Sequence, residues 1–319
     1  TPTAMPGVQA LKRRLRANVT ACGLVYRWDA RRHGQGFTII MYHRVLERSD
    51  PWHDRMGIHL SVFEAQLKML KRWCAVLSLD EILTRLDHHQ PLPRHCVALT
   101  FDDGFRDFYT LVWPLLKRYR LPATLYVTTG AIERGWMDLD VLRCAIQQTA
   151  ERSLTVSSLS DGPLVYSLAS EEERLRTFWA VVKRTMWMTN NDGRFLDEVS
   201  WNLLRIPPNA IQPERMMLSW DELQRVASDG VDIGAHTITH PNLASLPDEE
   251  AQREITASRA ELRGRLGCSI NHFAYPVGQP MHFSERTQAL VRGAGFKSAS
   301  STICGVNRPS ENRWSLKRI

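Results

Sequence analysis

The chain has 319 residues, of which 43% are hydrophobic and 24% charged, and these values are typical of a globular protein. The composition excludes disordered, collagen-like and coiled-coil classes, and no apolar run is long enough to cross a bilayer. The net charge is +7, but residues 1–36 carry +6 of it, because they hold seven basic residues against one aspartate. The remaining 283 residues are close to neutral, which disfavours nucleic-acid binding.

Residues 1–36 form a basic leader, and within it residues 8–28 are predicted as a basic amphipathic helix. Apolar residues recur there at three- and four-residue spacing: Val8, Leu11, Leu15, Val19, Cys22 and Tyr26. Such a helix is typical of segments that lie on an anionic membrane surface. A terminal helix packed on the protein is the alternative interpretation.

The cysteine pattern bears on the location of the protein. Six scattered cysteines without a CxxC pair favour a reducing compartment, and no secretory signal pattern is visible. We therefore expect a cytoplasmic protein that is peripheral on the inner face of the membrane. Because the sequence begins with Thr1 rather than Met, export directed by an upstream signal is the alternative.

From residue 37 onwards, strand and helix patterns alternate. Strands are predicted at residues 37–42, 95–101, 123–128, 231–235, 272–275 and 296–299, the last range being the final strand. Helices are predicted at residues 105–119, 248–266 and 284–292. Another helix is predicted to begin at the N-cap Ser61, with Glu64 in the capping box, and a further one to run from the N-cap Ser219 to Gly230. This alternation predicts a parallel α/β sheet, and the number of units favours closure into a barrel.

Residues 131–217 interrupt the alternation and are predicted as an α-helical insertion. Two helical stripes support this prediction: Leu175, Phe178, Val182 and Met186, then Phe195, Val199 and Leu203. We expect the four tryptophans at 136, 179, 187 and 201 to form the insertion's own core, with a lid or substrate groove as the alternative. The chain thus divides into the leader 1–36, a first barrel part 37–130, the insertion 131–217 and a second barrel part 218–319.

Two adjacent carboxylates, Asp102 and Asp103, directly follow the apolar strand 95–101 in the segment TFDDG. In a parallel barrel, active sites assemble at the carboxyl ends of the strands. Carboxylates at this position can ligate a metal ion and accept a proton. An ordinary acidic turn is the alternative interpretation.

A pair of histidines, His236 and His240, follows the strand 231–235 in the segment HTITH. Two imidazoles and one carboxylate, with a position left open for water, are the usual ligands of a catalytic zinc ion. We therefore expect Asp103, His236 and His240 to share one divalent ion, while Asp102 remains as a base. Zinc is the first expectation, and Fe, Co or Ni also suit this ligand set.

The segments TFDDG and HTITHPNL, in this order, resemble the polysaccharide deacetylase family (the NodB-homology domain, carbohydrate esterase family four). The resemblance covers residues 37–319 apart from the insertion. It implies a distorted (β/α) barrel and a hydrolase that removes N- or O-acetyl groups from sugars with a bound divalent metal ion. It also implies that Asp103, His236 and His240 are the metal ligands and that Asp102 is the general base.

The segment HFAYPVG at residues 272–278 resembles the third motif of that family. The resemblance implies that the N–H of Val277 stabilises the oxyanion, and that Tyr275 and Pro276 beside it contribute to substrate binding. The family motif usually begins with an arginine that braces the base, whereas this chain has Ala274 there. Another group must therefore orient Asp102, or nothing does.

Two further family motifs are missing: an aspartate-and-tryptophan motif, and a late Leu-x-His motif that supplies the general acid. The segment MYHRV at residues 41–45 resembles the signature of a branch of the family with rearranged motif order, in which the acid histidine comes from the N-terminal strand. We therefore predict that His43 is the general acid, with His272 and His282 as weaker candidates.

These observations predict a metal-dependent hydrolase that removes N-acetyl groups from an amino sugar in a polysaccharide or lipid-linked glycan. The expected partners are an N-acetylated glycan and an anionic membrane surface contacted by residues 8–28, with neither nucleic acid nor an obligate protein partner. Three alternatives stay open: deformylation or other C–N hydrolysis on a lipid-linked sugar, a catalytically inactive glycan-binding scaffold, and a peripheral membrane adaptor.

Overall fold

The computed structural model describes residues 36–319 except 49, 53–55, 157–163 and 188–213. The predicted helix at 8–28 and the second apolar stripe of the insertion lie outside these ranges. Within them, no helix combines the length and the apolarity that a membrane span requires. The five cysteines in the described ranges are free thiols.

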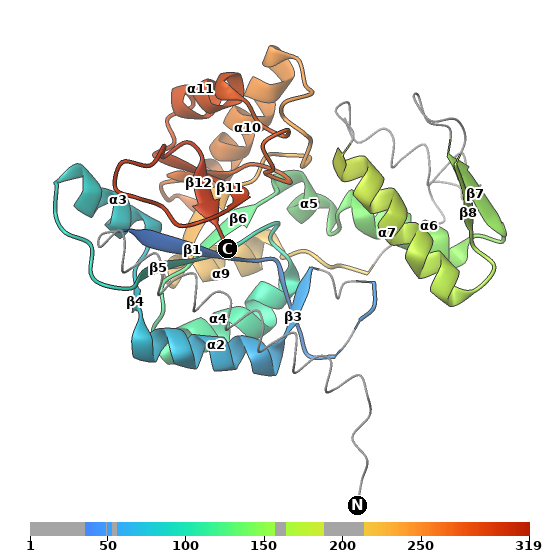
Figure 1. The fold of residues 1–319 in the computed structure, drawn as a ribbon, viewed down its shortest axis with the longest axis horizontal. Coiled ribbons are helices and arrows are strands. Elements are labelled where there is room, and N and C mark those ends of the chain that lie inside the picture. Colours follow the sequence, from blue (N-terminus) through green and yellow to red (C-terminus); the bar gives the residue numbers. More distant parts are fainter. Residues whose placement is uncertain (1–35, 49, 53–55, 157–163, 188–213) are drawn as a thin grey trace, which may run out of the picture.

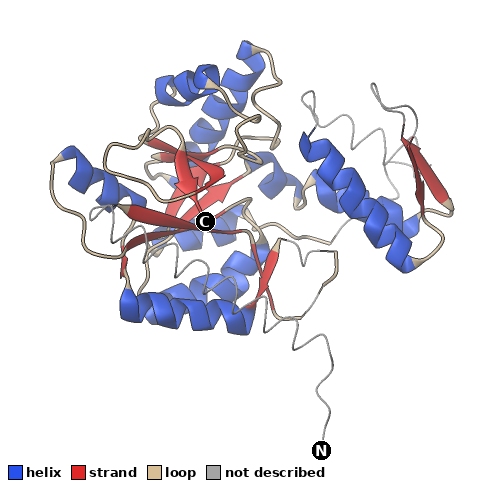
Figure 2. Cartoon of the chain, viewed as in Figure 1, coloured by secondary structure: helices blue, strands red, loops and turns tan. Residues whose placement is uncertain are grey.

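A parallel sheet closed into a barrel forms the centre of the molecule (Figures 1 and 2). Its strands, in spatial order, are β1 (Phe37–Tyr42), β5 (Cys96–Phe101), β6 (Thr124–Val127), β9 (Asp232–Ala235), β10 (His272–Ala274), β11 (Ser298–Cys304) and β12 (Leu316–Arg318). The short strand β4 (Ala75–Val76) pairs with the start of β5. Hydrogen bonds of 2.9 Å, from the Met41 N–H to the Ile319 carbonyl and from the Ile319 N–H to the Ile39 carbonyl, join the last strand to the first. The prediction of a distorted (β/α) barrel is confirmed.

Helices cover the outside of this barrel. They are α2 (Leu60–Trp73), α3 (Leu79–Asp87), a π-helical turn η1 (Phe108–Val112) continued by α4 (Trp113–Tyr119), α9 (Trp220–Ser228), α10 (Asp248–Leu266) and α11 (Glu285–Gly293). The bounds of α10 agree with the prediction, because Gly267 caps it in a left-handed conformation with φ 65°. A parallel pair, β2 (Arg44–Leu46) and β3 (Gly57–His59), lies beside α2.

Two predictions about this part of the chain are wrong. The N-cap of α2 is His59 rather than Ser61, because the His59 side chain accepts a hydrogen bond from the Ser61 N–H. Residues 296–299 are not the final strand, because β11 begins at Ser298 and β12 follows it. In addition, α3 and β4 have no counterpart among the predicted elements.

The described part of the insertion is mainly helical, as predicted, but it also contains an antiparallel hairpin that was not predicted. After α5 (Thr129–Arg134), which begins before residue 131 and packs in the barrel core, the insertion contains α6 (Asp138–Gln148), the antiparallel strands β7 (Ser153–Val156) and β8 (Leu164–Ser167), and α7 (Glu171–Trp187). It has a hydrophobic core of its own, to which Trp179 contributes, as expected, together with Phe178. Trp136 is half-buried outside this core, contrary to the expectation, and the side chains of Trp187 and Trp201 lie outside the described part of the chain. Trp52, from outside the insertion, joins this core with its ring 5.4 Å from that of Phe178.

Gly234 in β9 allows the close packing that positions the residues at the end of this strand. A Cβ atom at this position would lie 2.5 Å from Cδ1 of Tyr126 and 2.8 Å from the carbonyl oxygen of His272. The Tyr126 ring is fully buried and cannot move aside freely. We expect Gly234→Ala to lower the free energy of unfolding by about 1–3 kcal/mol, as is usual for overpacking. Chemical denaturation followed by circular dichroism measures this change.

Gly264→Ala provides a matched control, because a Cβ atom on this exposed position of α10 meets nothing within 4 Å. It is expected to leave the stability unchanged or to raise it by up to about 1 kcal/mol, because alanine favours a helix over glycine. Equal stabilities of the two variants would contradict the packing argument.

Candidate functional site

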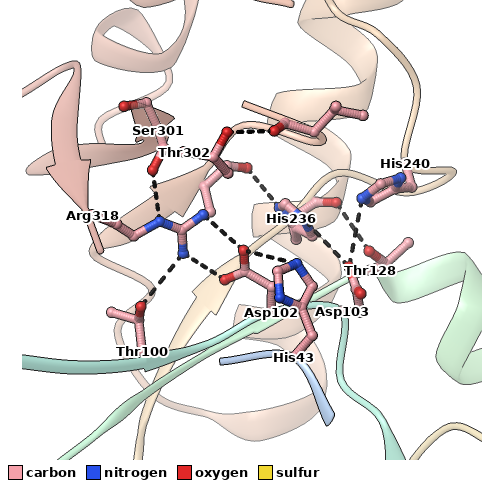
Figure 3. A network of polar contacts seen from close by, with 12 residues as sticks. His43, Thr100, Asp102, Asp103, Thr128, His236, His240, Ser301, Thr302 and Arg318 are labelled. Atoms are coloured by element: carbon pink, nitrogen blue, oxygen red, sulfur yellow. Dashed lines mark hydrogen bonds and ion pairs between the residues drawn. The ribbon is translucent and has the colours of Figure 1, made fainter. Parts of the chain in front are cut away.

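Loops that follow several parallel strands meet at one end of the barrel (Figure 3). Asp102 and Asp103 follow β5, His236 follows β9, and the turn that contains Val277 follows β10. His43 comes directly after β1. Because the strands are parallel, their carboxyl ends lie at the same edge, and the side chains predicted from the sequence converge there.

The backbone of these loops is held in an unusual conformation. Asp103, Thr237, His240 and Val277 have φ angles of 75°, 67°, 63° and 58°. The described residues include seven non-glycine residues with positive φ, and these four are all in the loops around the site. The left-handed region is strained for residues with a Cβ, above all for the β-branched Thr237 and Val277. Strain of this kind persists only where the surrounding contacts fix the backbone, so the loops are tightly held.

Asp103, His236 and His240 form a compact group of three candidate metal ligands. Oδ1 of Asp103 lies 3.4 Å from Nε2 of His236 and 3.5 Å from Nε2 of His240. Among the described residues this buried oxygen has no hydrogen-bond partner. Two ligand atoms at about 2.0–2.1 Å from a tetrahedral ion are separated by about 3.3–3.4 Å. The observed spacing and the unpartnered oxygen therefore fit a divalent metal ion.

The orientation of His236 is fixed from its other ring nitrogen. Nδ1 of His236 lies 2.8 Å from the carbonyl oxygen of Ala274, a contact in which Nδ1 carries the hydrogen. This arrangement leaves Nε2 unprotonated and facing Asp103 when the ring is neutral, which is the usual way in which proteins orient a ligating histidine. The backbone at Ala274 thus orients a candidate metal ligand, although its side chain cannot brace a base.

The charges of Asp103 and His240 suit metal binding. Burial lowers the pKa of His236, but the Asp103 and Asp102 carboxylates raise it overall, so a metal ion that binds there would displace a proton. Burial alone would raise the pKa of Asp103, but the contact with His236 and the attraction of His240 hold this pKa well below the usual value. Burial and the neighbouring His236 lower the pKa of His240 to about 4. At neutral pH the carboxylate is therefore ionised and the His240 imidazole is neutral, which are the forms that bind a metal ion.

The loop that carries both histidines is supported by α10 and α5. The buried Glu254 on α10 accepts hydrogen bonds from the N–H groups of Ile238 (2.8 Å) and Thr239 (3.0 Å), and from the Thr239 hydroxyl (2.8 Å). The Gly130 N–H in α5 donates to the Ile238 carbonyl (2.9 Å), and a Cβ atom on Gly130 would lie only 2.6 Å from that oxygen. Both elements therefore fix the position of His240 through the loop backbone.

Arg318, in the last strand, braces Asp102. Its guanidinium donates two hydrogen bonds to the Asp102 carboxylate, of 2.6 and 2.7 Å, and its Nε donates to the Ser301 carbonyl (2.7 Å). Both side chains are almost completely buried. Burial raises the pKa of Asp102, but the charge of Arg318 outweighs it, so that this pKa is lower than usual. Arg318 thus makes a contact with Asp102 that the alanine at position 274 cannot make.

Sequence reasoning did not identify Arg318, because a basic residue next to the end of a chain is typical of an exposed position. The segment 316–318 is too short to show a strand periodicity. Its burial depends on pairing with β11 and on the hydrogen bonds that close the barrel between β12 and β1.

His43 lies beside Asp102 and is partly exposed. Its Nε2 lies 3.9 Å from Oδ2 of Asp102, and 29% of its side chain is exposed. The other two candidates lie elsewhere. His272, at the start of β10, contacts Asp80 and Asp232 at the opposite end of the sheet, and the Nδ1 of His282 accepts a hydrogen bond from the Gln279 N–H.

The turn after β10 contains the three residues predicted to contact substrate. The Tyr275 side chain is fully buried, stacks on Phe283 with ring centroids 4.3 Å apart, and donates its hydroxyl hydrogen to the Trp314 carbonyl. This side chain therefore belongs to the core, contrary to the expectation that it contacts substrate. Pro276 is also buried, whereas Val277 is half-buried with its carbonyl fixed by the Thr302 hydroxyl (2.7 Å).

Comparisons with known proteins support one family. The family model "Polysaccharide deacetylase" matches residues 89–159 and 167–299. YxkH of Bacillus subtilis (strain 168), which carries a polysaccharide deacetylase name, is 30% identical over 282 residues, which make up 88% of this chain and 70% of that protein. The poly-β-1,6-N-acetyl-D-glucosamine N-deacetylase of Escherichia coli (strain K12) is 33% identical over 104 residues, which are 32% of this chain but only 15% of that protein.

Solved structures share the fold. The Streptococcus pyogenes deacetylase PplD, in complex with acetate, superposes with a TM-score of 0.59 at 19% identity, covering 89% of this chain and 91% of that chain. IcaB from Ammonifex degensii superposes with a TM-score of 0.57 at 20% identity, covering 90% of this chain and 92% of that chain.

The pair between Asp102 and Arg318 leads to a stability prediction. Arg318→Met leaves a buried carboxylate without its partner, and we expect the free energy of unfolding to fall by about 3–5 kcal/mol. The double variant Asp102→Asn/Arg318→Met should lose less than the sum of the two single variants, because it removes both charges. Urea denaturation measures all three values.

Arg176→Met on α7 serves as the control, because its ion pair with Glu172 is largely exposed, with 68% and 81% of the two side chains accessible. Its effect should stay within about 0.5 kcal/mol. Additive losses in the double variant would show that Asp102 and Arg318 do not depend on each other.

Proposed function

The chain belongs to the polysaccharide deacetylase family, and we propose that it removes N-acetyl groups from an amino sugar in a polysaccharide or lipid-linked glycan. The observation that carries this proposal is the convergence of Asp103, His236 and His240 beside a separate, buried carboxylate on Asp102. The Escherichia coli relative is named for poly-β-1,6-N-acetyl-D-glucosamine, which supports an N-acetylglucosamine polymer as the substrate class.

Asp103, His236 and His240 would hold one divalent metal ion, with zinc as the first choice and Fe, Co or Ni also suited to the ligands. When bound, such an ion supplies Lewis acidity, which polarises the acetyl carbonyl and makes water nucleophilic near neutral pH. The unpartnered oxygen of Asp103 supports this assignment, because a buried carboxylate oxygen without a donor otherwise costs free energy.

Asp102 would act as the general base. Arg318 binds both of its oxygens and keeps the carboxylate ionised at neutral pH, while each oxygen still has a lone pair free. The carboxylate accepts a proton from the attacking water, and its orientation stays fixed during the reaction. Arg318 acts through Asp102 and is therefore a positioning residue.

His43 would act as the general acid. In the protonated form it donates a proton to the departing nitrogen, the amide C–N bond breaks, and acetate and an amino sugar are released. The partial exposure of His43 supports this role, because the acid must reach a substrate that enters from solvent.

The N–H of Val277 would stabilise the oxyanion of the tetrahedral intermediate. Within the described ranges this N–H donates no hydrogen bond, and the left-handed conformation of Val277 is held by the Thr302 hydroxyl and by the hydrogen bond from the Thr302 N–H to the Gly278 carbonyl (2.9 Å). A free, rigidly held donor is what an oxyanion requires. Tyr275 and Pro276 would contribute through the shape of the turn.

The catalytically inactive scaffold loses its main support in this arrangement. It rested on Ala274 and on the missing late histidine, whereas Arg318 braces Asp102 and His43 lies beside it. Measuring formate beside acetate release from the acylated sugar distinguishes deformylation from deacetylation.

The metal ligands and the base can be separated by experiment. Asp103→Ala, His236→Ala and His240→Ala should each lose metal and activity together. Asp102→Asn should retain the metal and lose about 10²–10⁴-fold in rate, because only the proton acceptor is removed. Metal content by mass spectrometry, measured beside acetate release from an N-acetylglucosamine oligomer, tests both statements.

His88→Ala is the control, because His88 is an exposed histidine at the end of α3, and neither metal content nor rate should change. A fully active Asp102→Asn variant contradicts the assignment of the base, and a metal-free Asp102→Asn variant would make Asp102 a ligand.

The role of His43 is tested by the pH dependence of the rate. An acid must be protonated to act, so the rate of the wild-type protein should fall as rising pH deprotonates it. His43→Ala should remove this alkaline limb and lower the rate by about 10²–10⁴-fold. A slow variant that retains the alkaline limb would assign the acid to another group.

A further inference from the structure

The end of the barrel opposite the site carries a basic surface with exposed apolar side chains. We call it the α2–α4 surface, and it consists of Lys68, Met69, Lys71, Arg72, Trp73, Lys117, Arg118 and Arg120, all of them exposed. The helices α2 and α4 lie side by side (Figure 1), and the Lys71 ammonium donates a hydrogen bond to the Tyr119 carbonyl (2.8 Å). The two helices therefore present their basic residues as one surface.

Apolar side chains stand out on this surface. The described residues include four large hydrophobic side chains that are exposed, and two of them, Met69 (41% exposed) and Trp73 (65% exposed), are on α2. They are four residues apart and thus share one face of the helix. Arg72 lies over the Trp73 ring, with Cζ 5.0 Å from the centroid. An exposed tryptophan among cations is typical of proteins that bind at the interface between a membrane and water.

The surface has a strong excess of positive charge. Two carboxylates form ion pairs with three of its six basic residues. Glu64 lies 3.2 Å from Lys68 and 3.4 Å from Arg118, and Asp229 pairs with Lys117. The net charge is thus +4, although residues 37–319 together carry only +1. The rest of this part of the chain therefore sums to −3, and the positive charge is concentrated here.

The basic leader is attached at the same end of the barrel. Phe37 pairs with Cys96, and Cys96 also pairs with Ala75, which comes two residues after Trp73. The leader, residues 1–36, carries a charge of +6, and the α2–α4 surface is also positive. Repulsion between the two charges disfavours binding of the leader to this surface. The two charges would instead add up on one anionic partner.

We propose that the α2–α4 surface docks on an anionic lipid bilayer, with Trp73 and Met69 in the headgroup layer and the six basic residues against the anionic headgroups. Asp102 follows the opposite end of β5, a strand of six residues or about 20 Å. A protein docked in this way directs its site away from the bilayer. The proposal rests on the surface alone, so its outcome is independent of the deacetylase activity.

The test is sedimentation of the full chain with vesicles of phosphatidylcholine, with and without phosphatidylglycerol, at increasing NaCl concentration. The wild-type protein should bind only the vesicles that contain phosphatidylglycerol, and more weakly at high salt. Lys68→Gln/Arg72→Gln should weaken binding by about 25-fold, because each cation at an anionic membrane surface contributes about fivefold. Trp73→Ala should also weaken binding, and both variants should retain the activity and the circular dichroism spectrum of the wild type.

Arg253→Gln/Arg263→Gln is the matched control, because both arginines are exposed on α10, away from α2 (Figure 1), and it should bind as the wild type does. On binding, amide exchange should slow in residues 60–73 and 113–120. The leader is tested separately by Lys12→Gln/Arg13→Gln/Arg14→Gln/Arg16→Gln in the full chain.

Three results would each overturn the proposal. The first is a wild-type protein that does not sediment with the anionic vesicles. The second is Lys68→Gln/Arg72→Gln binding at wild-type strength while the leader variant loses all binding, which would assign the contact to the leader alone. The third is full competition by soluble polyphosphate at the same phosphate concentration, which would identify a soluble polyanion rather than a bilayer as the partner.

Discussion

The buried ion pair between Asp102 and Arg318 is the constraint on which the rest of the site depends. Two charges with almost no exposure are tolerated only when they are well paired, and the two hydrogen bonds of 2.6 and 2.7 Å meet this requirement. Asp102 follows β5, and Arg318 lies in β12 on the far side of β1. The pair can therefore form only when the barrel closes, so the fold and the orientation of Asp102 are coupled.

The same pair gives two adjacent aspartates different surroundings. Both oxygens of Asp102 accept hydrogen bonds from a permanently charged guanidinium, whereas Oδ1 of Asp103 has no hydrogen donor in the described structure and faces two imidazoles. The left-handed conformation of Asp103 turns the chain between them. Under the proposed function, one carboxylate would be held for proton transfer and the other left open for a metal ion, and environment rather than residue type separates them.

The part of this site that follows from local sequence could be predicted. Asp103 and His236 come within two residues of the end of an apolar strand, and His240 follows in the same loop as His236. Parallel strands bring their ends together regardless of distance along the chain. Arg318 could not be predicted, because its three-residue strand has no periodicity and its burial depends on partners more than 200 residues away in the sequence, such as Asp102. The hairpin of β7 and β8 was not predicted for a related reason. Strands of four residues are too short to show a clear alternation of apolar and polar residues, so their sequences resemble loops.

The parallel barrel also separates chemistry from attachment. All strands point the same way, so that every loop that carries a candidate catalytic residue lies at one end, while α2 and α4 end at the other, just before β4 and β6. Under the proposed function, a polymeric substrate would occupy far more space than the sugar that reacts, so the end with the site would have to stay open. A surface that attaches the protein to a partner leaves the site unobstructed when it lies at the opposite end of the barrel. The positive charge and the exposed tryptophan of the α2–α4 surface are found at that end.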